Sequence, residues 1–168
     1  MTSAVGVRPA LHRYVNKMPR WVVSAATRVV DEYGGDAGGI WANAPRAVVL
    51  RDRLNAFMGI SQKKAAMTVM LLWRTRGIEV GEMSGCDVAV DVHIRRVFLR
   101  SGLVERDDAV AIIRSARELN PELPGALDPP AWDVGRNWCH PQVPDCGPCP
   151  VGNACPQLSD RAVGVRGG

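Results

Sequence analysis

Four cysteines lie close together near the end of the chain, in the stretch CHPQVPDCGPCPVGNAC. Their spacing is C-x6-C-x2-C-x5-C, and they are Cys139, Cys146, Cys149 and Cys155. Thiolates are preferred ligands of zinc and of iron–sulfur clusters. Structural zinc sites usually show two separated pairs of ligands, whereas one compact run of four cysteines suits a [4Fe–4S] cluster. We therefore expect a [4Fe–4S] cofactor, with a zinc-bound structural domain as the alternative.

A lysine and an aspartate form a second candidate site. Lys63 stands at the start of a predicted helix, where it is either a phosphate contact or an amine nucleophile. Asp91, in VAVDVHI, stands at the mouth of another predicted helix. A carboxylate there is either an N-cap or a group that stabilises a developing cation or acts as a base. The neighbouring Lys64 is the alternative to Lys63.

A short break between two predicted helices is a candidate phosphate-binding turn. The stretch FMGIS joins them, and free backbone N–H groups at the start of the second helix favour an anion. The segment 46–76 carries seven Lys or Arg and one Asp, a charge of +6 against +4 for the whole chain. The basic surplus is therefore concentrated on this pair of helices, which points to nucleic acid as the partner.

The elements that must position these residues are all helical. Apolar residues recur at helical spacing, and Pro or Ser at the starts and Gly at the ends delimit the segments. The predicted helices are 18–33, 45–57, 62–76, 91–101, 107–119 and 127–139, with only a token of extended chain before residue 91. Segment 36–43 reads as a loop. We expect residues 18–138 to form the helical domain, 139–155 the cysteine loop, and 1–17 and 156–168 loose ends.

The combination strongly resembles the endonuclease III branch of the helix-hairpin-helix DNA glycosylases. The resemblance rests on GISQKKAA, VDVHIRRV, DVGRNWC and the cysteine spacing, in that order, over roughly residues 18–156. It implies an all-α helix-hairpin-helix glycosylase fold, here a partial helical barrel, with an iron–sulfur loop. It also implies base-excision repair of damaged or mismatched double-stranded DNA by a DNA glycosylase, either with or without AP-lyase activity.

The resemblance also implies roles for individual residues. Lys63 aligns with the nucleophile that attacks C1′, Asp91 with the catalytic aspartate, and the four cysteines with the cluster ligands. The DNA-binding turn would comprise Gly59, Ile60, Ser61, Gln62 and Lys64. Ser61 replaces the second glycine of the hairpin pattern, so we expect strain if that position needs a positive φ.

The length of the chain raises an alternative function. Only 56 residues precede Phe57 in the hairpin turn, roughly half of what family members carry. The alternatives are therefore a non-catalytic DNA-binding remnant or one subunit of a split enzyme, with a second chain or self-association completing the barrel. No signal peptide or membrane span is evident, which predicts a cytoplasmic protein, nucleoid-associated if bacterial.

Overall fold

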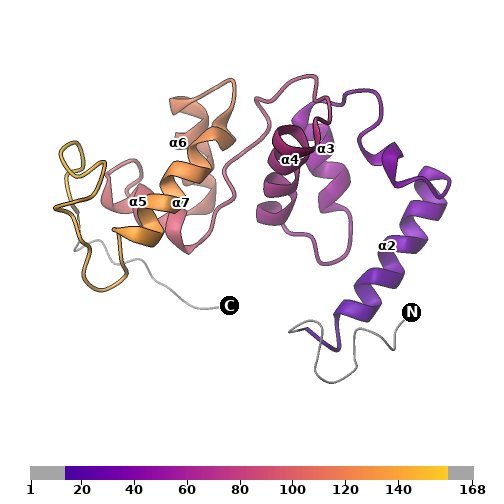
Figure 1. Cartoon of the computed structure of the whole chain (residues 1–168), viewed down its shortest axis with the longest axis horizontal. Coiled ribbons are helices and arrows are strands. Elements are labelled where there is room, and N and C mark those ends of the chain that lie inside the picture. The colour runs from indigo at the N-terminus through magenta and orange to yellow at the C-terminus, as the bar shows by residue number, and fades with distance from the viewer. Residues whose placement is uncertain (1–13, 159–168) are drawn as a thin grey trace. The chain divides into compact units, whose positions relative to one another are not determined.

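A computed structural model describes residues 14–158 of the chain. The chain divides into two compact units, one ending at Gly81 and the other beginning at Glu82, and each is described by itself (Figure 1). The predicted helical domain, 18–138, therefore draws on both units. Most of the two segments predicted to be loose, 1–17 and 156–168, lies outside the described residues.

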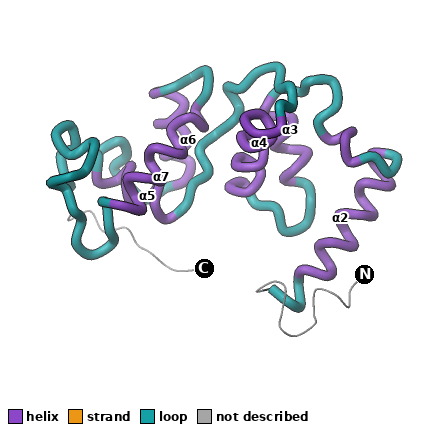
Figure 2. Tube along the Cα trace, viewed as in Figure 1, coloured by secondary structure: helices purple, strands orange, loops and turns teal. Residues whose placement is uncertain are grey.

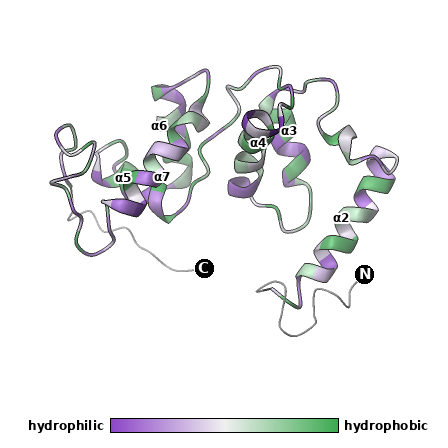
Figure 3. Cartoon of the chain, viewed as in Figure 1, coloured by the Kyte–Doolittle hydropathy of each residue, from purple (hydrophilic) through white to green (hydrophobic). Residues whose placement is uncertain are grey.

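The first unit consists of helices joined by short turns. They are α2 (Met18–Tyr33), the 3₁₀ turn η1 (Ala37–Ile40), α3 (Ala47–Asn55) and α4 (Gln62–Arg76). Helix α2 begins with a proline in its first turn and ends at Gly34, whose φ of +62° is the left-handed conformation that glycine favours. Hydrophobic and hydrophilic bands follow one another along the ribbon of α2 (Figure 3). The helix therefore has an apolar side that can pack on the rest of the unit.

The core of the first unit lies between α3 and α4. Its buried residues are Ile40, Ala47, Leu50, Ala65, Ala66 and Val69. Small side chains at 65 and 66 let the two helices approach closely. None of the residues of α2 is buried, so this helix contacts the pair without being enclosed by it.

The second unit contains α5 (Val92–Arg100), α6 (Ala109–Leu119), the 3₁₀ turn η2 (Pro124–Leu127) and α7 (Asp128–Asn137), followed by the cysteine loop. Its core is a cluster of buried apolar side chains: Val88, Ile94, Phe98, Leu99, Val104, Ile112 and Ala116. Helices α5 and α7 pack closely against each other. The cysteine loop therefore leaves directly from a helix that is anchored on α5.

Described residues 14–158 contain helices and loops and no strand (Figure 2), which confirms the all-α prediction. The short extended stretch predicted before residue 91 forms no strand in that range. The η1 turn was predicted as part of a loop, and it forms because Asp36 caps it by accepting a 2.8 Å hydrogen bond from Gly38 N. Within the same range, no helix combines the length and the apolar character that a membrane span requires.

Candidate functional site

The turn between α3 and α4 is built around Gly59. Its φ is +87°, and Ile60 N donates a 3.0 Å hydrogen bond to the Phe57 carbonyl across the turn. A Cβ on Gly59 would lie 2.6 Å from Cδ2 of Trp21, a side chain of α2. Glycine is therefore required at this position for two reasons: the positive φ of the backbone and the close approach of the Trp21 indole.

Ser61 follows as the N-cap of α4 with φ −98° and ψ 169°. This is ordinary extended backbone, so the strain predicted for a non-glycine residue at this position is wrong. The positive φ of the turn falls on Gly59, two residues earlier. The Ser61 hydroxyl makes no capping hydrogen bond to the first turn of α4, so its side chain does not compete with an anion for those N–H groups.

The two lysines at the start of α4 are placed differently. Lys64 Nζ donates a 2.7 Å hydrogen bond to the Gly59 carbonyl and lies 5.5 Å from the centre of the Trp21 ring. Lys63 is half-buried and precedes it by one residue, which turns its side chain about 100° around the helix axis. Lys64 is thus engaged in holding the turn, and Lys63 presents its amine on another side of the helix.

Asp91 is the N-cap of α5 in the second unit. Its Oδ1 accepts hydrogen bonds from His93 N at 2.9 Å and from Ile94 N at 3.0 Å. The capping role that the sequence left open is therefore confirmed. The same two bonds fix the direction of the half-buried carboxylate at the mouth of the helix.

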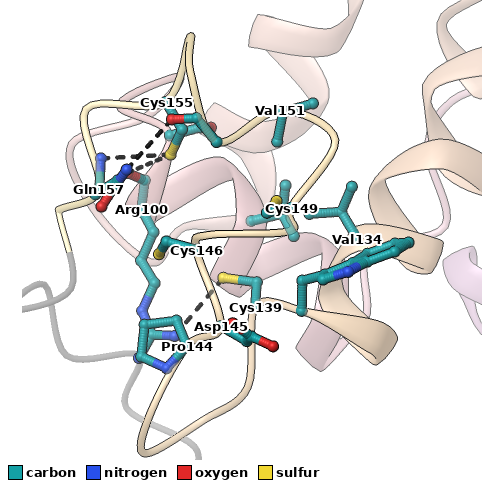
Figure 4. A pocket seen from close by; sticks show the side chains of 14 residues that line it. Arg100, Val134, Cys139, Pro144, Asp145, Cys146, Cys149, Val151, Cys155 and Gln157 are labelled. Atoms are coloured by element: carbon teal, nitrogen blue, oxygen red, sulfur yellow. Dashed lines mark hydrogen bonds between the residues drawn. The ribbon is translucent and has the colours of Figure 1, made fainter.

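The four cysteines line one hollow of the second unit (Figure 4). Cys139 follows the last turn of α7, and its N–H donates to Val134 O at 2.8 Å. The segment that carries the other three folds through tight turns, with Cys155 N donating to Val151 O at 2.9 Å. A Cβ on Gly152 would lie 2.5 Å from Cys146 O, so the loop needs glycine at this crossing.

Two buried arginines of α5 tie this loop to the helices. Arg96 donates to the carbonyl oxygens of Cys139 and Gly135 and lies 3.1 Å from His93 Nδ1. Arg100, one turn later, donates to the carbonyl oxygens of His140 and Pro141 at 2.5 and 2.7 Å. The first ligand position and its two successors are therefore held by side chains of the helix that Asp91 caps.

Burial and neighbouring charges shift the pKa values of Cys146 and Arg96. Burial raises the pKa of the Cys146 thiol, and the neighbouring Cys139, Cys155 and Cys149 raise it further, against the opposing effect of Arg100. Burial lowers the pKa of Arg96, because it disfavours the charged guanidinium. The neighbouring Cys139 partly offsets this decrease. A raised pKa disfavours the Cys146 thiolate, and a positively charged metal centre bound by this thiolate would oppose that effect.

The arrangement of the cysteines bears on which centre fits. Among residues 14–158, no three Cys, His, Asp or Glu side chains converge closely enough to hold one metal ion. Four cysteine thiolates are the usual ligand set of a [4Fe–4S] cluster, in which they bind different irons, and they can also bind a single zinc ion.

Comparisons with known proteins agree with this reading of the residues. Endonuclease III of Synechocystis sp. is 26% identical to the chain over 143 residues, covering 80% of the chain and 53% of the relative. A solved structure described as a trapped endonuclease III–DNA covalent intermediate, in an estranged-adenine complex, superposes with a TM-score of 0.62. It is 25% identical and covers 88% of this chain and 61% of that one. The chain is similar to endonuclease III in sequence and in fold.

No family model matches the sequence. The chain spans about half the length of the curated relative and about three fifths of the solved one. The likeness covers 80% and 88% of the chain, which exceeds either unit alone, so it extends over both units.

The structure gathers the predicted site residues into two groups. Gly59, Ile60, Ser61, Gln62, Lys63 and Lys64 share the hairpin of the first unit, while Asp91 and the four cysteines belong to the second. Sequence reasoning missed the roles of Trp21, Arg96 and Arg100. For the arginines, the signal was their spacing of four in HIRRVFLR, which places two cations on a helix side otherwise occupied by apolar residues.

Proposed function

We propose that the chain is a base-excision DNA glycosylase with AP-lyase activity that acts on damaged or mismatched bases in duplex DNA. The observation that carries the proposal is the likeness to endonuclease III in sequence and in fold, across 80% and 88% of the chain. The lysine after the hairpin, the aspartate at the mouth of α5 and the cysteine spacing add support.

In the proposed mechanism, the hairpin binds a phosphate and the target nucleotide is extruded from the duplex. The Lys63 amine attacks C1′ of the sugar as the C1′–N bond to the base breaks, and the departing base takes up a proton. The Asp91 carboxylate stabilises the positive charge that develops on the sugar. The new C1′–N bond then assists ring opening: the C1′–O4′ bond breaks, O4′ takes up a proton and stays on C4′ as a hydroxyl, and a Schiff base remains between Lys63 Nζ and C1′. Abstraction of a proton from C2′ then expels the 3′ phosphate by β-elimination.

A [4Fe–4S] cluster held by Cys139, Cys146, Cys149 and Cys155 is part of the proposal. The four cysteines line one hollow, and four thiolates are the ligand set that such a cluster takes. When bound, the cluster would fix the course of the loop after α7. The metal content of anaerobically purified protein tests this: about four irons support it, and one zinc without iron contradicts it.

Borohydride trapping tests the chemistry. Protein would be incubated with duplexes that carry an abasic site or one of several damaged bases, and covalent complexes would be counted on denaturing gels. The wild type should trap the abasic duplex, Lys63→Ala should not, and Lys64→Ala should. If the wild type, with its metal site filled, traps no duplex and excises no base, the glycosylase proposal is wrong.

A second candidate is favoured by one observation: α2 carries an apolar side, and none of its residues is buried. A non-catalytic DNA-binding protein, or one subunit of a split glycosylase in which a second chain covers that side, fits this fact. Trapping that appears only when a second protein is added would support the split enzyme.

A further inference from the structure

Arg100 makes contacts with both ends of the cysteine loop. Only 6% of the residue is exposed. Its Nη1 lies 3.6 Å from Cys139 Sγ, and its carbonyl oxygen lies 3.6 Å from Cys155 Sγ. The same carbonyl accepts a 3.0 Å hydrogen bond from Leu158 N, just beyond the last cysteine. One residue of α5 therefore touches the first and the last of the four thiols.

One donor of this side chain has no acceptor. Within the described part of the chain, Arg100 Nε is buried and makes no hydrogen bond, although both terminal nitrogens do. A buried N–H without an acceptor is unfavourable, so native proteins rarely keep one. Arg100 lines the hollow that the four cysteines surround (Figure 4). The missing acceptor is therefore best sought in whatever fills that hollow.

The charge around the hollow points the same way. Arg100 is the only cationic residue among the described residues that line it. The loop itself, residues 139–158, contains no Lys or Arg, and Asp145 is its only Asp or Glu. Four thiolates on a [4Fe–4S]²⁺ core carry a net charge of −2. A buried guanidinium at this place would offset part of that charge.

We propose that Arg100 Nε donates a hydrogen bond to a sulfur atom of the bound cluster, and that Arg100 thereby sets the cluster's retention and its reduction potential. The inference rests on the proposed [4Fe–4S] cofactor. A nearby cation and N–H···S hydrogen bonds stabilise the more negative state, so they raise the potential at which the cluster accepts one electron. Arg100 is in this sense a positioning and tuning residue for the cofactor.

The experiment uses the full chain, purified anaerobically, as wild type, Arg100→Gln, Arg100→Lys and Arg106→Gln. Arg106 is an exposed arginine of the same unit and serves as the matched control. Iron and sulfide content and the reduction potential on an electrode would be measured for each. Circular dichroism would report folding. Arg100→Gln should lower the iron content severalfold. It should also shift the reduction potential of the remaining cluster to a more negative value. Arg100→Lys should restore iron content while its potential stays below that of the wild type, and Arg106→Gln should match the wild type.

The outcomes separate this inference from the proposals beneath it. Iron-loaded wild type together with Arg100→Gln of equal iron content and equal potential overturns the role of Arg100 and leaves the cluster standing. Wild type without iron overturns the cluster and this inference together. If Arg100→Gln does not fold, the Arg100→Lys potential decides, because loss of the Nε donor should still lower it; a value equal to that of the wild type overturns the inference. Base excision by the wild type is measured in a separate assay, so its failure would overturn the proposed glycosylase activity without deciding the role of Arg100.

Discussion

Lys64 Nζ lies 2.7 Å from the carbonyl oxygen of Gly59 and 5.5 Å from the centre of the Trp21 ring. This places one cation between the turn that joins α3 and α4 and the side chain of α2 that packs on it. The hydrogen bond uses one of the three donors of the ammonium group. The hairpin is therefore not a self-contained pair of helices, because its turn is shaped from outside by α2.

The first prediction concerns the two reasons for glycine at position 59. Gly59→Ala should destabilise the protein by about 1–3 kcal/mol, because the new methyl group meets Trp21 and the backbone keeps a positive φ. Urea unfolding would measure the change. Gly77→Ala is the matched control, since Gly77 also has a positive φ of +62° but would place its methyl group in open space.

The difference between these two variants isolates the contact with Trp21. We expect Gly59→Ala to cost more than Gly77→Ala, and to weaken DNA binding as well. Equal losses of stability would show that the indole moves aside without cost, and that α2 does not shape the turn.

The second prediction concerns the origin of DNA affinity. Residues 14–81 carry ten Lys or Arg and five Asp or Glu, whereas residues 82–158 carry seven and eleven. Duplex binding should therefore depend on the first unit and fall steeply with salt. Lys64→Gln should reduce the slope of log K against log [salt] by about 0.9 if the ammonium also meets a phosphate. Fluorescence anisotropy at several salt concentrations would measure the slope.

Arg114 of α6 supplies the control, because it is exposed and lies in the acidic second unit. Arg114→Gln should leave the slope unchanged. A loss of affinity in Lys64→Gln that is the same at every salt concentration would assign Lys64 to the shape of the turn alone.

The third prediction concerns the cysteine loop. Cys146→Ser should lose the metal centre and expose residues 139–158 to proteolysis, because the buried part of this segment is small and its cysteines face the hollow. Iron content and limited proteolysis would be compared with those of the wild type. Cys86→Ala is the control, since Cys86 is buried elsewhere in the same unit. Full iron content in Cys146→Ser would remove Cys146 from the ligand set.

The helices could be predicted from the sequence because their boundaries are local. Pro19 opens α2, Gly34 and Gly77 end α2 and α4, and Asp91 caps α5, all with signals within a few residues. The expected strain at Ser61 was wrong for a local reason too. The residue that needs a positive φ depends on how the turn closes, and Gly59 takes that conformation.

The roles of Trp21 and Arg100 could not be predicted, because they depend on contacts between distant parts of the chain. Trp21 meets Gly59 across 38 positions, and Arg100 meets Cys139 across 39. Nothing within a few residues of either side chain indicates its partner. Periodicity placed both on helices, but only the packing of α2 on the hairpin and of α5 on α7 decides what each side chain touches.

The last prediction separates the two roles of Asp91. The carboxylate caps α5 through Oδ1, and we propose that it also stabilises positive charge on the sugar. Asparagine caps a helix about as well as aspartate, but it carries no charge. Asp91→Asn should therefore unfold at nearly the wild-type urea concentration while excising its base on the order of 10²–10³-fold more slowly.

Asp91→Ala completes the comparison, because it removes the cap together with the charge. It should lose about 1 kcal/mol of stability and also excise slowly. Single-turnover excision and urea unfolding would be measured on the same preparations. If Asp91→Asn excises as fast as the wild type while Asp91→Ala is slow only in proportion to its lost stability, Asp91 is a helix cap and nothing more. The countercharge for the sugar must then come from another group.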